Sequence, residues 1–197
     1  MSAIHEHVLQ NGMTLLCWPQ RHLHGLEFGL YLKGGPLYET EETQGISNLL
    51  EHLCFRGLGG LNREGLLREL NRFGTNLDAA TYAEGLVFRL KCLPRFFDAA
   101  LEYFLRFFAN VPWTPEQIAA EKQVVLRQLE ADGDGDLFDR AACDFRRTEN
   151  GAFPPLGTPE SLMALTEADI QLWQEMIFQP QNACLVMTGN FSDGMEL

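Results

Sequence analysis

Positive charge is scarce in this chain. Its 197 residues include 15 lysines and arginines against 27 aspartates and glutamates, which gives a formal net charge of −12. The electrostatic field of a negatively charged protein repels nucleic acid and anionic membrane surfaces, so we expect neither as a partner. The same field mildly favours basic peptides.

Paired cysteines and long apolar runs are also lacking. The cysteines are scattered, odd in number and without a C-x-x-C pair: Cys17, Cys54, Cys92, Cys143 and Cys184. Such cysteines are typical of small core residues in a reducing compartment. The first residues, MSAIHEHVLQNG, resemble neither a signal peptide nor an Arg-rich presequence, and no apolar run is long enough to span a membrane. These features predict a cytoplasmic protein.

Strands and helices are predicted in separate groups. Strands are expected on either side of Asn11-Gly12, which indicates a two-residue hairpin turn, over 25–35, on either side of Glu84-Gly85, and over 182–188. Helices are expected over 43–55, 61–74, 94–110, 137–147 and 167–178, with another from Thr114 to the DGDGD stretch. This grouping predicts an α+β fold. Since no repeat or linker is visible, we expect one domain over 1–197.

The stretch GISNLLEHLCFRG, residues 45–57, raises the question of a metal site. Its apolar residues recur at helical spacing, and Glu51 and His52 follow Asn48 by about one turn. In the zinc signature H-x-x-E-H, histidines at i and i+4 share a helix face and bind one ion. The intervening glutamate can act as a general base. Here the first histidine is missing, so the pair alone favours an ordinary amphipathic helix.

Several separated blocks change this interpretation. They are GLYLKGGPLYETEETQGISNLLEHLCFRG, which includes Glu39; GTNLDAATYAEGLVFRL; EKQVVLRQLEAD; and the run from PLGTPES to NACLVMTGNF. In this order they resemble the pitrilysin and mitochondrial-processing-peptidase family, the inverzincins, over nearly the whole chain. The resemblance implies a processing-peptidase-like metallohydrolase fold. That fold is a two-layer sandwich, with a mostly antiparallel sheet and helices on one of its faces.

The resemblance also implies where zinc is held in the family, and there this chain departs. Asn48 stands at the position of the first histidine ligand, and Gln128 at that of the glutamate ligand. Glu51 remains at the general-base position, His52 at one ligand position, and Glu121 at the glutamate that supports the ligands from outside. Amide oxygens are poor zinc donors compared with imidazole or carboxylate. We therefore expect zinc, the family's cofactor, to be absent or weakly bound here.

Three functions stay open. The first is a non-catalytic, peptide-binding or structural partner of an active homologous subunit or domain, since the family pairs such domains in homo- or heterodimers. This chain would then be the N-terminal-type half of a two-domain unit. The second is an active metalloendopeptidase with an altered metal site that uses Glu51 and His52, and the third is a scaffold domain. The resemblance also implies that peptide binds as an added strand along Asp78, Ala79, Ala80, Thr81 and Tyr82.

Other motifs favour structural roles. The two H-x-H pairs, His5 with His7 and His22 with His24, match no ligand position of the family. DGDGDLFD, residues 132–139, begins like a calcium loop, but it lacks the glycine and glutamate that such a loop needs. YFLRFF, residues 103–108, is expected in the core.

Overall fold

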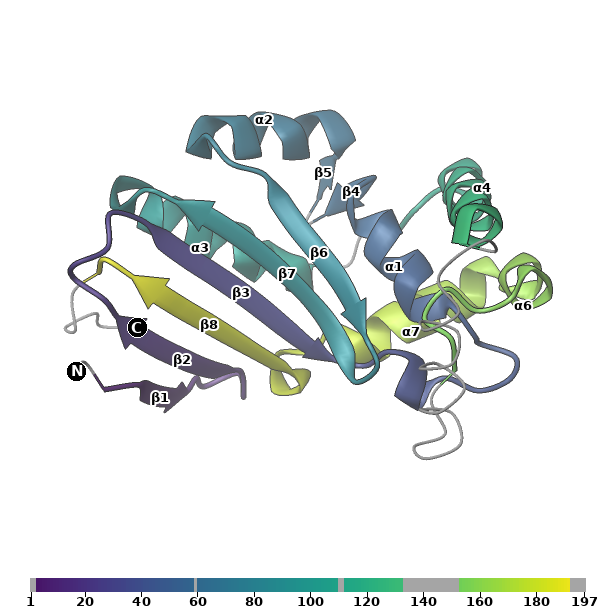
Figure 1. Cartoon of the computed structure of the whole chain (residues 1–197), viewed down its shortest axis with the longest axis horizontal. Helices are drawn as coiled ribbons and strands as arrows, with labels where there is room; N and C mark the ends of the chain where they lie inside the picture. Colours follow the sequence, from purple (N-terminus) through teal and green to yellow (C-terminus); the bar gives the residue numbers. More distant parts are fainter. Residues whose placement is uncertain (1–2, 59, 110–111, 133–152, 192–197) are drawn as a thin grey trace.

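The computed structural model describes residues 3–58, 60–109, 112–132 and 153–191. A six-stranded sheet forms its centre, with the strand order β1-β2-β8-β3-β7-β6 (Figure 1). The strands are β1 His5–Val8, β2 Thr14–Pro19, β3 Leu26–Lys33, β6 Leu77–Tyr82, β7 Gly85–Cys92 and β8 Ala183–Gly189. Within this sheet β2 and β8 are parallel and the other neighbours are antiparallel. The predicted α+β class and mostly antiparallel sheet are confirmed.

The sheet has one buried and one open face. Successive side chains of a strand point to opposite faces, and burial follows this alternation in β3, β7 and β8. In β3 the buried side chains are Leu26, Phe28, Leu30 and Leu32. On the open face, Trp18 is 44% and Val186 36% exposed. The hydrophobic core therefore lies on one side of the sheet.

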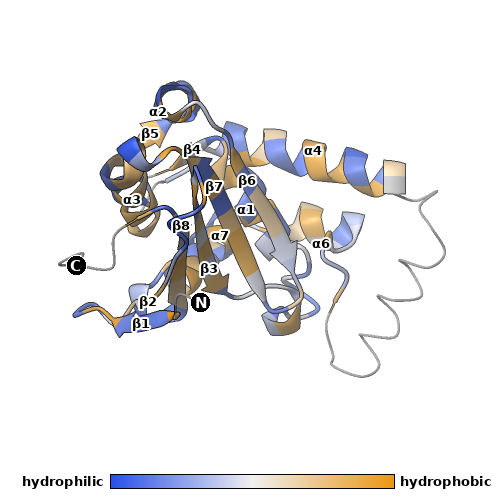
Figure 2. Ribbon diagram, turned by 60° about the vertical axis from the view of Figure 1, so that its left-hand side comes forward, coloured by the Kyte–Doolittle hydropathy of each residue, from blue (hydrophilic) through white to orange (hydrophobic). Residues whose placement is uncertain are grey.

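Helices cover the buried face and continue beyond β6. They are α1 Ile46–Cys54, α2 Arg63–Phe73, α3 Phe97–Leu105, α4 Pro115–Asp132, α6 Pro159–Ala164 and α7 Glu167–Ile177. In Figure 1, α3 and α7 lie behind the sheet, and α1, α4 and α6 lie past its β6 edge. Figure 2 shows hydrophobic and hydrophilic residues alternating along α4. In the part of the chain that the structure describes, no helix combines the length and apolarity needed to cross a membrane.

An aromatic cluster joins α3 and the turn after it to the sheet. The ring of Phe104 lies 5.9 Å from that of Phe28 in β3, measured between centroids. The ring of Phe107 lies 4.7 Å from that of Phe88 in β7. Aromatic rings bury large apolar areas, so these contacts are a main part of the core. The expected core position of YFLRFF is confirmed for Tyr103, Phe104 and Phe107, whereas Leu105 is 45% exposed.

The helix ends carry the caps that their residue types favour. The backbone N–H of Thr114 donates to Gln117 Oε1 at 2.9 Å, and that of Gln117 donates to Thr114 Oγ1 at 3.3 Å, which is a capping box at the start of α4. Thr166 forms another at the start of α7. Gly74 ends α2 with a left-handed φ of 67°.

Other expectations need correction. The first hairpin forms, but its loop is longer than two residues: the N–H of Leu9 bonds Met13 O, and Gly12 has φ 87°. A glycine with positive φ ending a three-residue loop fits the strand twist. The helix expected over 94–110 is α3 flanked by short 3-10 turns, η2 Pro94–Phe96 and η3 Arg106–Phe108. The expected helix over 137–147 and residues 133–139 of the calcium-like motif lie outside the described residues.

Candidate functional site

A carboxylate from outside α1 holds the start of this helix. Glu39 accepts hydrogen bonds from the backbone N–H groups of Gly45 at 2.8 Å and Ser47 at 3.0 Å. These groups have no carbonyl partner within the helix. Gly45 has φ 85°, and a Cβ there would lie 2.7 Å from the carbonyl oxygen of Leu156. Glu39 and Gly45 therefore fix the position of α1 and of the side chains that it carries.

Glu51 meets β6 from the buried side of α1. It is 9% exposed, and Thr81 Oγ1 donates a hydrogen bond of 2.5 Å to its Oε2. Burial raises the pKa of Glu51 above its ordinary value, while the Thr81 hydrogen bond and the nearby His52 act in the opposite direction. Carboxyl groups that exchange protons at functional sites commonly have a pKa raised in this way by burial.

His52 and Arg56 both meet Glu121 of α4. His52 Nδ1 lies 3.4 Å from Glu121 Oε2, and Arg56 Nε donates to Glu121 Oε1 in an ion pair. A histidine that binds metal commonly directs its other ring nitrogen to a carboxylate, so this contact is compatible with a ligand role for His52 through Nε2. The sequence analysis did not single out Arg56, which lies just after the end of α1 and four residues after His52, a spacing that brings side chains of a helical turn to the same side.

The two amides at the former ligand positions lie in different surroundings. Asn48 is 9% exposed, and its Oδ1 has no hydrogen-bond partner among the described residues. Gln128 lies on α4 about two turns after Glu121 and is exposed. Of the two amides, therefore, only that of Asn48 is buried.

This set of donors does not fit a zinc ion. A catalytic zinc site takes three protein ligands from imidazole, thiolate or carboxylate groups, and His52 alone offers one at a ligand position. Within residues 3–58, 60–109, 112–132 and 153–191, no three His, Cys, Asp or Glu side chains gather closely enough to hold a metal. The H-x-H pairs add no third ligand. One lies in the exposed strand β1, and the other, His22 with His24, lies in the loop before β3 and not in a strand.

A cavity of about 410 Å³ opens beside the contact between His52 and Glu121. Its apolar lining comes mainly from α2 and the start of β6: Leu66, Leu67, Leu70 and Leu77. Arg56 and Arg63 add charge to the lining. Small-ligand cavities have this size and this combination of apolar walls with a few polar groups. The cavity is therefore suited to an apolar side chain of a bound peptide.

β6, the strand predicted to bind peptide, lies at one edge of the sheet and pairs with β7 alone in the described part of the chain. Because Thr81 faces Glu51, Ala79 shares its face, and alternation places Asp78, Ala80 and Tyr82 on the open face. The hydroxyl of Tyr82 accepts from Arg89 Nη2 at 3.2 Å. The structure thus brings Thr81 to the predicted general base, a role that the sequence did not indicate. Peptide binding along β6 stays a prediction.

Comparison with curated proteins identifies relatives that are named as a protease and as a peptidase subunit. An uncharacterized zinc protease of Rickettsia felis is 26% identical over 185 residues, which cover 92% of this chain and 45% of the relative. The mitochondrial-processing peptidase subunit beta of Caenorhabditis elegans is 26% identical over 146 residues, which cover 73% of this chain and 32% of that subunit. The chain therefore spans less than half the length of these relatives.

Solved structures show the same fold. A protease from Helicobacter pylori matches with a TM-score of 0.87 at 21% identity, over 98% of this chain and 47% of the other. A peptidase M16 inactive domain from Pseudomonas fluorescens matches with a TM-score of 0.84 at 16% identity, over 96% and 47%. The family profile described as Insulinase (Peptidase family M16) matches residues 24–147, more than half of the chain, including Asn48, Glu51, His52, Glu121 and Gln128. The predicted family is confirmed: this chain belongs to the insulinase family of peptidases, family M16.

Proposed function

We propose that this chain is a non-catalytic, peptide-binding half of a processing-peptidase-type assembly, and that an active homologous subunit or domain supplies the hydrolysis. The observation that carries the proposal is the set of donors around His52. Asn48 offers a buried amide and Gln128 an exposed one at positions where a zinc peptidase needs an imidazole and a carboxylate. Two weak donors beside one imidazole hold zinc poorly, so no bond cleavage is assigned to this chain.

The edge strand β6 supports peptide binding. An edge strand offers unpaired N–H and C=O groups along one side, and an extended peptide can pair with them as an added strand. The apolar cavity beside His52 lies close to this strand, since Leu77 lines the cavity and also begins β6. A peptide that pairs with β6 can therefore place one side chain in the cavity.

A homologous partner is supported by the length of the relatives. The chain matches 45% of the Rickettsia felis relative and 32% of the Caenorhabditis elegans relative, and the latter is named as a subunit. On our proposal, the second half comes from another domain or subunit of the same fold. Such a pair can be a homodimer or a heterodimer.

We also propose a reducing, cytoplasmic setting. Cys17, Cys54, Cys92 and Cys184 are free thiols, and the first three of these are buried. Buried free cysteines are compatible with a compartment that keeps thiols reduced.

The test begins with metal content and cleavage. The purified chain is analysed for zinc by mass spectrometry, and peptide cleavage is assayed with and without a chelator. The proposal expects substoichiometric zinc and no chelator-sensitive cleavage. Stoichiometric zinc with cleavage that a chelator abolishes would refute it and would establish the altered metallopeptidase, which the contact of His52 Nδ1 with Glu121 favours.

A gain-of-binding variant sharpens this test. Asn48→His with Gln128→Glu restores an imidazole and a carboxylate, so zinc uptake should rise toward one ion per chain. The matched control combines Asn48→His with Gln123→Glu, because Gln123 is also exposed on α4 but points to another side of the helix. Equal zinc uptake by the two double variants would contradict the placement of the ligand positions.

Peptide binding is tested separately from metal binding. Isothermal titration with unstructured basic peptides should show saturable binding. Thr81→Pro should weaken it, because proline removes a backbone N–H and disturbs β6. The matched control is Thr14→Pro in β2, a strand enclosed by β1 and β8, which disturbs the sheet without touching β6. Absence of any peptide binding would favour the scaffold function instead.

A further inference from the structure

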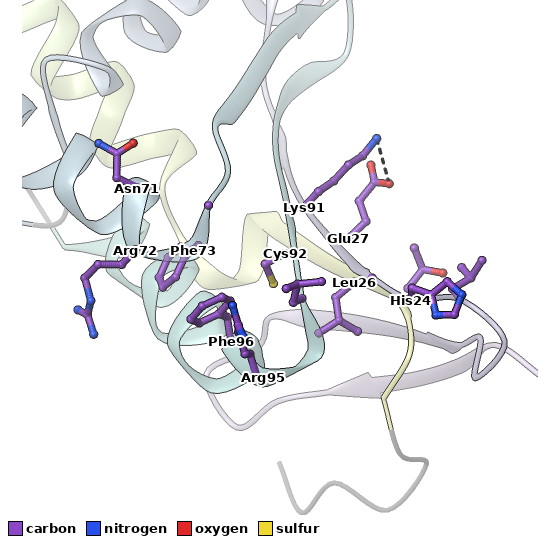
Figure 3. Close-up of a pocket in the computed structure, with 15 residues that line it drawn as sticks. His24, Leu26, Glu27, Asn71, Arg72, Phe73, Lys91, Cys92, Arg95 and Phe96 are labelled. Atoms are coloured by element: carbon purple, nitrogen blue, oxygen red, sulfur yellow. Dashed lines mark ion pairs between the residues drawn. The ribbon is translucent and has the colours of Figure 1, made fainter.

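A second cavity lies at another end of the sheet, away from Glu51 and His52. Its volume is about 780 Å³, and its lining comes from the start of β3, the ends of α2 and β7, and η2 (Figure 3). None of the residues named at the candidate metal site lines it. The size falls within the range of cavities that hold small organic ligands.

The floor of this cavity is apolar. Leu26 and Phe73 are each 4% exposed and Cys92 is 7% exposed, so all three side chains are almost fully buried. The rings of Phe73 and Phe96 lie 5.9 Å apart between centroids, and Figure 3 shows both beside Cys92. Leu93 is 46% exposed and adds an apolar side chain to the lining. An alkyl chain or ring placed here would cover the exposed apolar surface of Leu93 and of the half-buried Phe96.

The charged lining is mainly basic, in contrast to the chain as a whole. Arg72, Lys91 and Arg95 line the cavity together with one acid, Glu27, whereas the full sequence has 27 acidic against 15 basic residues. A ligand with a negative charge therefore meets attraction here that most of the surface does not offer.

The three cations differ in how strongly they are already paired. Arg72 Nη1 donates to both carboxylate oxygens of Glu69, at 3.0 and 3.1 Å. Lys91 Nζ lies 3.8 Å from Glu27 Oε2, a long contact between exposed groups that holds it weakly.

Arg95 has no carboxylate partner among the described residues. Its guanidinium carbon lies 4.8 Å from the centroid of the Phe96 ring. Stacking on an aromatic face orients a guanidinium and leaves its N–H edge free to bind an oxyanion. Arg95 therefore places guanidinium N–H donors beside the apolar floor of the cavity.

We propose that this cavity binds an anion that carries an apolar group, in which a carboxylate lies next to an alkyl chain or ring. Arg95 binds the carboxylate, Lys91 adds positive charge, and the floor of Leu26, Phe73 and Phe96 contacts the apolar group. Two sources share this chemistry: a free medium-chain fatty acid, and the C-terminus of a peptide that ends in an apolar residue. The site requires no metal and is independent of the proposed function.

The first experiment uses the unmodified chain. Octanoate and the neutral octanol are titrated, and binding is followed by isothermal titration and by chemical-shift changes of the cavity residues. Octanoate should bind saturably and at least about tenfold more tightly than octanol, because a charged hydrogen bond contributes on the order of one to two decades in affinity. Short peptides ending in Leu-Phe are then compared as free acids and as amides to distinguish the two sources.

Variants locate the site. Arg95→Ala should weaken octanoate binding about 10- to 100-fold, and Arg95→Lys should recover part of the loss because the charge remains. Leu93→Glu should also weaken octanoate binding, since it places a negative charge in the lining. The matched control is Arg68→Ala, which removes an exposed arginine of α2 that pairs with Glu64 and does not line the cavity. Because Leu93 and Arg95 are exposed, these variants should fold.

Three results would overturn the proposal. The first is octanol binding as tightly as octanoate, and the second is equal loss of binding in Arg68→Ala and Arg95→Ala. The third is no saturable binding of octanoate or of the peptide acids up to about 10 mM, which corresponds to almost no affinity. Binding of the peptide acid but not of octanoate would identify a peptide C-terminus as the ligand, and the reverse would identify a free acid.

Discussion

From the hydrogen bond between Thr81 and Glu51 we predict how the free energy of unfolding depends on pH. Thr81→Val keeps the shape of the side chain but removes its hydroxyl group. That hydroxyl donates a hydrogen bond to Glu51 Oε2, with 2.5 Å between the two oxygens. Hydrogen bonds to charged groups contribute about 1.5–3 kcal/mol, and a bond between neutral groups about 1 kcal/mol. For the ionised form of Glu51, which higher pH favours, we expect Thr81→Val to lower the free energy of unfolding by about 2 kcal/mol.

The sign of the pH dependence follows from the pKa of Glu51. Burial raises this pKa, so the contribution of Glu51 to stability is fully present below its unfolded pKa and is lost as the pH rises through the folded pKa. The Thr81 hydrogen bond opposes the rise, so Thr81→Val should move the folded pKa further up. The loss caused by Thr81→Val should therefore be larger at pH 8 than at pH 4.

The assay is urea unfolding of four proteins at both pH values: the parent chain, Thr81→Val, Glu51→Gln and the double variant. In the Glu51→Gln background the Thr81 substitution should lower the free energy of unfolding by only about 1 kcal/mol, since the acceptor is neutral. The cycle then gives a coupling free energy of about 1 kcal/mol at pH 8. Equal losses at pH 4 and pH 8, or zero coupling, would refute this reasoning.

Further substitutions test the support of α1 by urea unfolding. Glu39→Ala should lower the free energy of unfolding by about 2 kcal/mol, because two backbone N–H groups at the start of α1 lose their acceptor; a loss below about 0.5 kcal/mol would contradict the capping role. Leu50→Ala, at a fully buried position, should lower it by about 2–5 kcal/mol, whereas Leu67→Ala, at a position 49% exposed, should change it much less. Gly45→Ala should also destabilise the chain, since its Cβ would collide with Leu156 O. An unchanged midpoint of urea unfolding would show that the backbone before α1 does not pass this close to Leu156.

Local features were predictable because the interacting groups are close in the sequence. The capping boxes at Thr114 and Thr166 each join residues three positions apart, and the left-handed conformation at Gly74 depends on that glycine alone. The alternation of β3 likewise follows from its own residues. The ligand substitutions Asn48 and Gln128 were visible once the family resemblance had aligned them.

Tertiary structure alone decided the features that join distant segments. Pairing of β2 with β8 brings residues 14–19 beside 183–189 in parallel, a direction that no local pattern encodes. Arg56 meets Glu121 across 65 positions, and Thr81 meets Glu51 across 30. The sequence by itself determined the caps at Thr114, Thr166 and Gly74, the strand faces and the chemical types at the candidate site. Which groups touch, which amide is buried, and where a basic cavity forms were decided by packing, because contact and burial depend on the whole folded chain.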